Sequence, residues 1–339
     1  MSNLPLTLAT SDYDHVRDIT TGAVRVDDID ITHLTIRDPL EMFDRFLKSS
    51  EFDASEMSMG RYTAMVSQGD DSLAAIPVFP SRMFRLSAVY VRTDGPVKTP
   101  EDLAGKRVGV VAWTQSATVY ARGWLSDYVG VDLKSIDWVQ AGDDHADRRE
   151  AAKLKLPDGL SLTQIRDRTL SEMMLAGELD AAIIAIPPVA MQQGSPEIRR
   201  LLPDPRAAEE KYWADTGIFP IMHAIVIRRE VIDDNPWVAQ NLFKAFVEAK
   251  NRSLGRALYG TRFPIPMCHY EARKIRARFG NDFWPYGVEP NRATLEAFLK
   301  FSFEQGACRR HVTPEELFVE QPESFQTLGL KGFEADAAL

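Results

Sequence analysis

Strand-like and helix-like segments alternate along this chain, and this order restricts the fold more than any other feature of the sequence. Residues 4–9 and 29–36 alternate apolar with polar side chains, which is typical of strands. Residues 39–47 and 60–67 instead show the spacing of helices. Strands joined through helices pair mainly in parallel, and such sheets bind ligands beyond the carboxyl ends of their strands. The sequence therefore predicts an α/β protein with a largely parallel sheet.

A break in composition at residues 92–97 indicates a boundary between two units. Thr99, Pro100 and two acidic residues follow it, and this order of residues is typical of a helix start. The pattern of strands and helices then resumes, with strands expected at residues 106–112 and 221–227 among others. Because a chain of 339 residues exceeds the usual size of one domain, we expect two domains.

Two segments resemble parts of type II solute-binding proteins. Residues 99–110, TPEDLAGKRVGV, resemble the opening of the second lobe, and residues 175–184, LAGELDAAII, resemble the strand that closes its sheet. The resemblance implies a two-lobed, type II periplasmic-binding-protein-like α/β fold with a ligand cleft between the lobes. It also implies that lobe one is discontinuous, so we expect lobe one at residues 1–95 and 218–339 and lobe two at residues 96–217.

Three longer segments are similar to the 4,5-dihydroxyphthalate decarboxylase family. They are residues 75–91, AIPVFPSRMFRLSAVYV, residues 219–236, FPIMHAIVIRREVIDDNP, and residues 283–298, FWPYGVEPNRATLEAF. The resemblance extends from about Leu6 to Phe318 and implies non-oxidative loss of CO2 from an aromatic diacid, without a cofactor. Leu86 departs from the expected pattern, which has histidine after the second arginine of this loop, so the substrate's ring substituents stay open.

The net charge of −9 argues against nucleic acid or an anionic membrane as a partner, because both attract cationic surfaces. A small anionic ligand is still compatible with this charge, since a few local arginines can outweigh the global field. No apolar stretch has the length of a membrane span, and the first residues lack the pattern of a secretory signal. We therefore expect a cytoplasmic protein.

The sequence predicts no metal site. The run that contains Asp143, Asp144, His145 and Asp147 is rich in oxygen ligands, but its spacing matches no known metal-binding loop, so a solvated polar loop is the preferred interpretation. The two cysteines lie far apart and form no CxxC pattern. Phosphate loops, dinucleotide fingerprints and nucleophile elbows are also missing from the sequence.

Arg82 and Arg85 lie between two expected strands, at residues 74–79 and 87–91, and are candidates for carboxylate binding. A guanidinium group binds a carboxylate through two parallel hydrogen bonds, and a phthalate-like ligand carries two adjacent carboxylates. A surface loop with solvated arginines is the alternative. In the family, this loop implies a substrate-binding role, with one arginine bracing the other.

Glu56 and Ser58 lie where an expected strand ends, and Arg61 follows one helical turn later. This position faces the ligand in open α/β sheets. Glu56 could orient an arginine or accept a phenolic proton, and an Arg–Glu brace without chemistry explains it equally well. We expect Ser58 and Arg61 to contact the substrate.

Thr114 and Ser116 follow the expected strand at residues 106–112 and open a helix. Free backbone N–H groups and the helix dipole at this end favour a carboxylate, and the hydroxyl groups add neutral donors. Ordinary N-capping uses the same residue types. We expect this helix start to bind an anionic group of the substrate.

His223 is the candidate general acid, because decarboxylation of an arene requires protonation of a ring carbon near neutral pH. A core histidine that donates to a backbone carbonyl is the alternative. Asp12, in the first strand-to-helix loop, could meet a ring hydroxyl or simply cap the loop. Trp284 and Tyr286, in the sequence WPYG, could stack on the substrate ring or pack under a loop.

Together these features predict a cofactor-independent decarboxylase of aromatic compound catabolism, a carboxy-lyase that acts on a hydroxylated phthalate or a similar aromatic carboxylate. A non-catalytic solute-binding protein for an aromatic acid shares the fold and the arginines, and is the alternative from another functional class. An enzyme of the same family with a shifted substrate is the third hypothesis. The sequence is compatible with a homo-oligomer.

Overall fold

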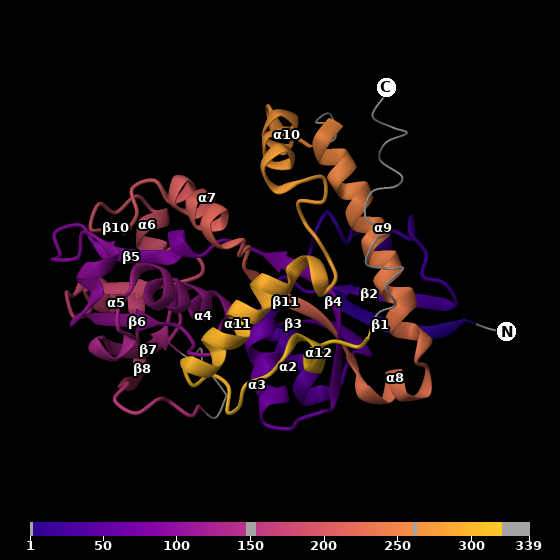
Figure 1. Cartoon of the computed structure of the whole chain (residues 1–339), viewed down its shortest axis with the longest axis horizontal. Coiled ribbons are helices and arrows are strands. Elements are labelled where there is room, and N and C mark those ends of the chain that lie inside the picture. Colours follow the sequence, from indigo (N-terminus) through magenta and orange to yellow (C-terminus); the bar gives the residue numbers. More distant parts are fainter. Residues whose placement is uncertain (1–2, 147–153, 260–262, 321–339) are drawn as a thin grey trace.

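The computed structural model describes residues 3–146, 154–259 and 263–320, and its strands form two sheets that lie side by side (Figure 1). The first sheet has the order β2-β1-β3-β11-β4. Its strands are β1 (Leu4–Thr10), β2 (Ile29–Thr35), β3 (Ala54–Ser58), β4 (Leu73–Arg82) and β11 (Ile221–Arg228). β1 pairs in parallel with β2 and β3, whereas β11 lies antiparallel between β3 and β4.

The second sheet has the order β10-β5-β9-β6-β7-β8. Its strands are β5 (Val89–Arg92), β6 (Arg107–Val110), β7 (Asp137–Gly142), β8 (Leu162–Thr169), β9 (Ala181–Ile183) and β10 (Ile198–Arg200). β6 to β9 pair in parallel, and β5 lies antiparallel between β9 and β10. The chain leaves the first sheet after β4 and returns to it with β11, which makes the first lobe discontinuous.

The expected residue limits of the lobes, 1–95, 96–217 and 218–339, remain a prediction. The two sheets show which strands belong to each lobe, but not at which residue of a connecting segment one lobe ends and the other begins. The strand β5 already belongs to the second sheet, so the change of sheet comes before the composition break at residues 92–97. Residues 80–82, which we expected in a loop, extend β4 instead.

Helices surround both sheets, and their sequences explain where several of them begin. In the first lobe they are α1 (Arg17–Thr20), α2 (Pro39–Ser49), α3 (Met59–Ser67), α8 (Arg229–Asp234), α9 (Trp237–Tyr259), α10 (Cys268–Phe279), α11 (Arg292–Glu304) and α12 (Pro314–Leu317). The second lobe has α4 (Ser116–Gly123), α5 (Leu170–Leu175), α6 (Val189–Gln192) and α7 (Pro205–Thr216). The Asp38 side chain accepts a hydrogen bond from the Leu40 amide and caps α2, with Pro39 in the first turn.

Buried contacts between α4 and the first lobe hold the two lobes together. The Ser116 hydroxyl donates to the Met222 carbonyl over 2.8 Å and accepts from the Gly60 amide over 3.1 Å. Gly60 lies so near the Thr114 carbonyl that an added Cβ would be 1.8 Å from that oxygen. α4 also packs on α11 between the sheets (Figure 1). A side chain larger than hydrogen at position 60 therefore does not fit this interface.

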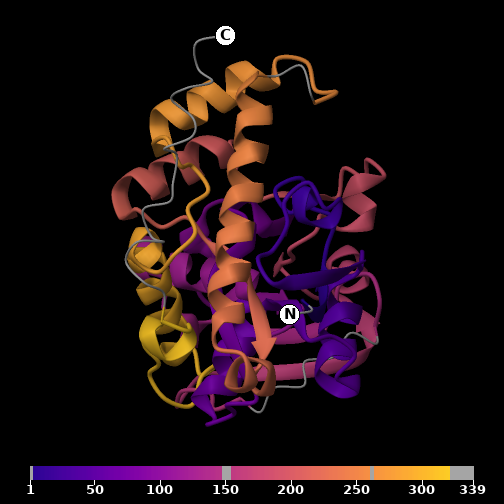
Figure 2. The ribbon, with the colours of Figure 1, turned by 90° about the vertical axis from the view of Figure 1, so that its right-hand side faces the viewer.

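No helix of the described residues is long and apolar enough to cross a membrane. The longest helix, α9, runs along the outside of the first lobe and packs against α1 and β4 (Figure 2). Its largely buried residues Lys250, Ser253 and Arg256 contact loops of the candidate site, which lies at the carboxyl ends of β1 and β3.

Candidate functional site

An irregularity in β4 shapes the candidate site. Ile76 pairs with Ile225, and the next paired residues are Ser81 and His223, so β4 advances five residues while β11 advances two. The bulged segment 77–80 contains two prolines, which lack the N–H group that a regular ladder requires. β-Bulges redirect side chains and are common beside active sites. Here the bulge brings the end of β4 next to His223.

Side chains from distant loops bind the backbone that the bulge frees from the ladder. The Trp284 indole donates to the Phe79 carbonyl over 3.0 Å, and His15 Nε2 lies 2.9 Å from the Pro80 carbonyl. Because a carbonyl can only accept, His15 carries its proton on Nε2. Burial lowers the pKa of His15 to about 4, although the Pro80 carbonyl opposes this effect, so the ring is neutral near pH 7. The His15 and Trp284 rings lie 5.3 Å apart and join the two loops.

A fully buried carboxylate, Glu56, forms the centre of the site. Glu56 Oε1 lies 2.5 Å from His223 Nδ1 and accepts from the Tyr13 hydroxyl over 2.7 Å. Glu56 Oε2 accepts from the Ser11 amide over 2.9 Å. Since Nδ1 of His223 donates to Glu56, Nε2 is the nitrogen that remains for proton transfer. The His223 side chain is 17% exposed, so a ligand can reach it.

The hydrogen bonds to Glu56 determine its ionisation. Burial raises the pKa of Glu56, but the hydrogen bond and charge of His223, together with the Ser11 amide and the Tyr13 hydroxyl, outweigh burial and lower it overall. Burial and the nearby Glu56 charge raise the pKa of Tyr13 far above its usual range, so Tyr13 remains a hydrogen-bond donor. The site therefore holds a carboxylate that orients a histidine.

Arg82 is buried at the end of β4, with 7% of the residue exposed. It donates to the carbonyls of Phe219 and Pro285 over 2.7 and 3.1 Å, and its guanidinium carbon lies 4.2 Å from the centre of the Phe219 ring. The Nε–H group is buried without a hydrogen-bond partner. Burial lowers the pKa of Arg82 to about 10. Arg82 thus packs between the start of β11 and the WPYG turn.

Arg85 connects the two lobes. It donates to the Ala185 carbonyl in lobe two over 3.1 Å and lies 3.1 Å from the Met222 sulfur beside His223. Burial lowers the pKa of Arg85 to about 10. Within the described residues, no carboxylate oxygen lies within 4.0 Å of either Arg82 or Arg85. A buried cation, Arg82, and a partly buried one, Arg85, are costly without a paired carboxylate, and an anionic ligand would offset this cost.

The other expected binding residues are placed as follows. Ser58 and Ser116 lie within hydrogen-bond distance of each other, at 3.2 Å, across the two lobes. Thr114 is buried beside Gly60 in the same contact. Arg61 donates to Asp44 over 2.9 Å and is a partly exposed ion pair of the first lobe. The Ser116 hydroxyl already binds the Met222 carbonyl and the Gly60 amide. Contacts between the lobes therefore explain the polar residues at the start of α4 without a ligand.

Asp12 and the two aromatic residues of the WPYG turn differ in their surroundings. Asp12 is exposed at the end of β1. Trp284 is bound to the bulge and to His15, as described above, while Tyr286 is buried against Phe79, with ring centres 6.4 Å apart. Burial raises the pKa of Tyr286 well above its usual value. The roles assigned to the site residues from the sequence all remain predictions.

Sequence reasoning did not place Lys250 and Asp282 near the site, and it did not predict the contact of Tyr13 with Glu56. Tyr13 lies in the loop that we had considered for Asp12, and its bond to Glu56 depends on a contact between residues 43 positions apart. Lys250, 1% exposed, is paired with Asp282 over 2.5 Å. A lysine within an amphipathic helix is usually exposed, so no local sequence pattern predicts the burial of Lys250.

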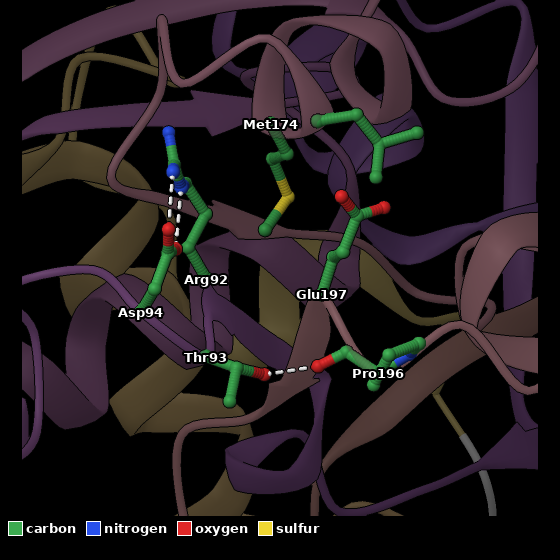
Figure 3. A pocket seen from close by; sticks show the side chains of 7 residues that line it. Arg92, Thr93, Asp94, Met174, Pro196 and Glu197 are labelled. Carbon is green, nitrogen blue, oxygen red and sulfur yellow. Dashed lines mark hydrogen bonds and ion pairs between the residues drawn. The ribbon is translucent and has the colours of Figure 1, made fainter.

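Two other places in the molecule are separate from this cluster. A hollow on the outer edge of the second sheet is lined by Arg92, Thr93, Asp94, Met174, Leu175, Pro196 and Glu197 (Figure 3). Its one arginine is already paired with Asp94 over 2.9 Å. Of the acidic run near residue 145, Asp144 accepts from the Ser171 hydroxyl over 2.6 Å, and Asp147 lies outside the described residues.

Comparison with solved structures shows the fold of the chain. The periplasmic aliphatic sulphonate binding protein SsuA from Escherichia coli superposes with a TM-score of 0.55 at 15% identity, over 94% of this chain and 98% of that protein. The desulfurization enzyme DSZB, in a variant bound to biphenyl-2-sulfinic acid, gives 0.56 at 16% identity, over 96% of this chain and 98% of that one. The type II periplasmic-binding-protein fold expected from the sequence is therefore confirmed.

Sequence comparison shows the family. No family model matches the chain. The 4,5-dihydroxyphthalate decarboxylase of Comamonas testosteroni is 35% identical over 321 residues, which cover 94% of this chain and 97% of that enzyme. The enzyme of the same name from Pseudomonas putida is 33% identical over 214 residues, 63% of this chain and 83% of that one. This chain belongs to the 4,5-dihydroxyphthalate decarboxylase family.

Proposed function

We propose that this protein is a decarboxylase of a hydroxylated aromatic dicarboxylate, with 4,5-dihydroxyphthalate as the first substrate to test. The observation that carries the proposal is the Glu56–His223 pair beside the buried Arg82 and the partly buried Arg85, which lack a carboxylate partner among the described residues. The names of the two relatives support the same reaction class.

The arginines supply the binding of the substrate. A guanidinium group binds a carboxylate through two hydrogen bonds, and a buried guanidinium favours an anion that neutralises it. Arg82 contacts Phe219, four residues before His223, and Arg85 contacts Met222, which directly precedes His223. A diacid held by these arginines would thus lie near the histidine.

His223 supplies the proton. In the proposed reaction, Nε2–H of the His223 imidazolium protonates the ring carbon that carries the departing carboxylate. The bond from that carbon to the carboxylate then breaks, its electron pair restores the aromatic ring, and CO2 leaves. For 4,5-dihydroxyphthalate the product is 3,4-dihydroxybenzoate. The exchange of a carboxylate for a proton needs no electron acceptor.

Glu56 holds His223 and is unsuited to the phenolic proton, one of the roles we considered from the sequence. Its side chain is fully buried, and His223, Tyr13 and the Ser11 amide already bind its two oxygens. We assign to it the stabilisation of the imidazolium, as a buried carboxylate does in other catalytic histidine pairs. The exposed carboxylate Asp12 remains the candidate for a ring hydroxyl.

Replacement of His223 tests the catalytic proposal. His223→Gln should lower kcat by roughly 10²–10⁴, the usual contribution of a positioned acid. Its affinity for the diacid should change much less, because the arginines bind the carboxylates. Calorimetry and turnover are measured on the same folded variant. Full turnover in His223→Gln would remove His223 from the mechanism.

The fold likeness to SsuA favours a second candidate, a binding protein for an aromatic acid. Such a protein would bind the diacid with the same arginines and release no CO2. Wild-type protein that binds 4,5-dihydroxyphthalate and related diacids without turnover would support this alternative over the decarboxylase.

A further inference from the structure

Helix α9 carries three largely buried polar side chains, whereas the other residues that this helix buries are apolar. Lys250, Ser253 and Arg256 follow one another at intervals of three residues, which places them along one side of the helix. Lys250 and Ser253 are 1% and 7% exposed, and 14% of the Arg256 side chain is exposed. We name these three residues the α9 stripe. Burial of two cations on one helix face is costly unless each has a partner.

Ser253 and Arg256, the two residues of the α9 stripe nearer the C-terminal end of the helix, bind the loop that follows β1. The Ser253 hydroxyl donates to Asp14 Oδ2 over 2.6 Å, and Arg256 donates to the Asp14 carbonyl over 2.9 Å. Arg256 also donates to both carboxylate oxygens of Asp18, over 2.9 and 3.0 Å. The same loop carries Tyr13, which binds Glu56. The stripe therefore holds the segment that directly follows Tyr13, at Asp14 and Asp18.

Lys250, the first residue of the stripe, binds the segment that leads into the WPYG turn. Lys250 Nζ lies 2.5 Å from Asp282 Oδ2, and the other oxygen of Asp282 accepts from the Trp284 amide over 3.2 Å. Lys250 Nζ also lies 5.3 Å from the centre of the Tyr286 ring. Burial lowers the pKa of Lys250, and the charge of Asp282 opposes this effect.

The two loops meet at the site. The His15 ring lies 5.2 Å from Tyr13 and 5.3 Å from Trp284, and both His15 and Trp284 bind the bulge in β4. A rigid helix that binds both loops sets the distance between them. Figure 2 shows that α9 is one continuous element over the full height of the first lobe.

We propose that the α9 stripe is the positioning element of the site: Lys250, Ser253 and Arg256 hold the Tyr13 loop and the Trp284 turn so that Glu56 and His223 keep their alignment. This inference rests on the proposed function for its effect on turnover. Its effect on the geometry of the histidines is independent of any substrate. None of the three residues touches the reacting atoms, so they are positioning residues.

Two mild variants test the proposal, Arg256→Lys and Ser253→Ala. Lysine keeps the charge of Arg256 but lacks the planar guanidinium group, whose N–H groups bind Asp14 and Asp18 at once. The matched control is Arg168→Lys, which removes the same fork from an exposed pair with Glu178 in lobe two, with distances of 2.6 and 2.8 Å. We expect kcat on 4,5-dihydroxyphthalate to fall roughly tenfold to hundredfold in both stripe variants, with KM much less affected. The control should keep wild-type kcat.

The second measurement needs no substrate. In protein with isotope-labelled histidine, the imidazole signals of His15 and His223 should shift in Arg256→Lys and Ser253→Ala, and should stay in place in Arg168→Lys. Shifts in the stripe variants alone would support the proposal even if the wild-type protein releases no CO2. Unchanged histidine signals in both folded stripe variants would overturn it, as would a loss of kcat no larger than in the control.

Discussion

Replacement of Glu56 by glutamine removes one charge from the centre of the site and keeps the shape of the side chain. In the wild type, the two oxygens accept from His223, Tyr13 and the Ser11 amide. The glutamine amide can offer one oxygen to these donors, and its NH2 group must face another donor. Glu56→Gln therefore weakens all three contacts in a place that water does not reach.

The size of this effect follows from burial. Each hydrogen bond to a charged group contributes about 1.5–3 kcal/mol, and breaking a buried ion pair costs about 3–5 kcal/mol. Glu56 is 0% exposed, so solvent does not screen this loss. We expect Glu56→Gln to reduce the free energy of unfolding by about 3–5 kcal/mol at pH 7. The exposed carboxylate Glu289, paired with Arg292, offers a control, and Glu289→Gln should leave the free energy of unfolding nearly unchanged, because solvent screens an exposed ion pair.

The pH dependence has a definite sign. The net effect of its surroundings lowers the pKa of Glu56 in the folded protein. Its contribution to stability is therefore fully present above the pKa of an unfolded glutamate, about 4.3, and is lost as the pH falls through the lower folded value. The difference between wild type and Glu56→Gln should be large at pH 7 and should narrow below about pH 4.

Urea unfolding followed by circular dichroism measures the stability of both variants at pH 7 and at acid pH. Turnover is measured under conditions in which Glu56→Gln remains folded, and kcat should fall roughly 10²–10⁴-fold because the histidine loses the carboxylate that orients it. Wild-type stability and turnover in Glu56→Gln would refute the role of Glu56. A stability difference that stays constant with pH would refute the assignment of a buried carboxylate.

Two further predictions concern binding and the contact between the lobes. Arg82→Lys should weaken binding of an aromatic diacid by about 2–5 kcal/mol, because lysine cannot form the two-pronged bond, and calorimetry with unchanged affinity would remove Arg82 from the site. Gly60→Ala should lower the free energy of unfolding by about 3 kcal/mol, since its Cβ would lie 1.8 Å from the Thr114 carbonyl. The control Gly22→Ala has no atom within 4 Å of its added Cβ and only the strain of its φ of +71°, so it should cost about 1–2 kcal/mol. Equal stability losses in both glycine variants would contradict the close approach of the lobes.

Much of the fold could be predicted because local patterns agree with it. The strands at residues 4–9, 29–36 and 221–227 are present as β1, β2 and β11, and the expected helix at residues 39–47 is part of α2. The strands β8 and β10 and the helix α10 were not anticipated. β8 and α10 each bury a single residue, so neither shows a periodic apolar face.

The candidate site was predicted less completely, because its contacts join residues that are far apart in the sequence. The sequence placed Glu56 at the end of one expected strand and His223 within another, at residues 221–227. It could not show that the two side chains touch, since that requires the antiparallel pairing of β3 with β11. It also could not foresee the bulge in β4, which sets the position of Arg82. The α9 stripe is similar: Lys250 and Arg256 look like ordinary surface charges until the two loops they bind are in place.

The most direct test of the decarboxylase proposal follows both products of one reaction. Wild-type protein is incubated with carboxyl-labelled 4,5-dihydroxyphthalate in D2O, and labelled CO2 and the aromatic product are followed together. We predict one CO2 for each substrate consumed, and 3,4-dihydroxybenzoate with deuterium at the carbon that lost its carboxylate. Bound diacid without any labelled CO2, across a panel of hydroxylated phthalates, would contradict the proposal.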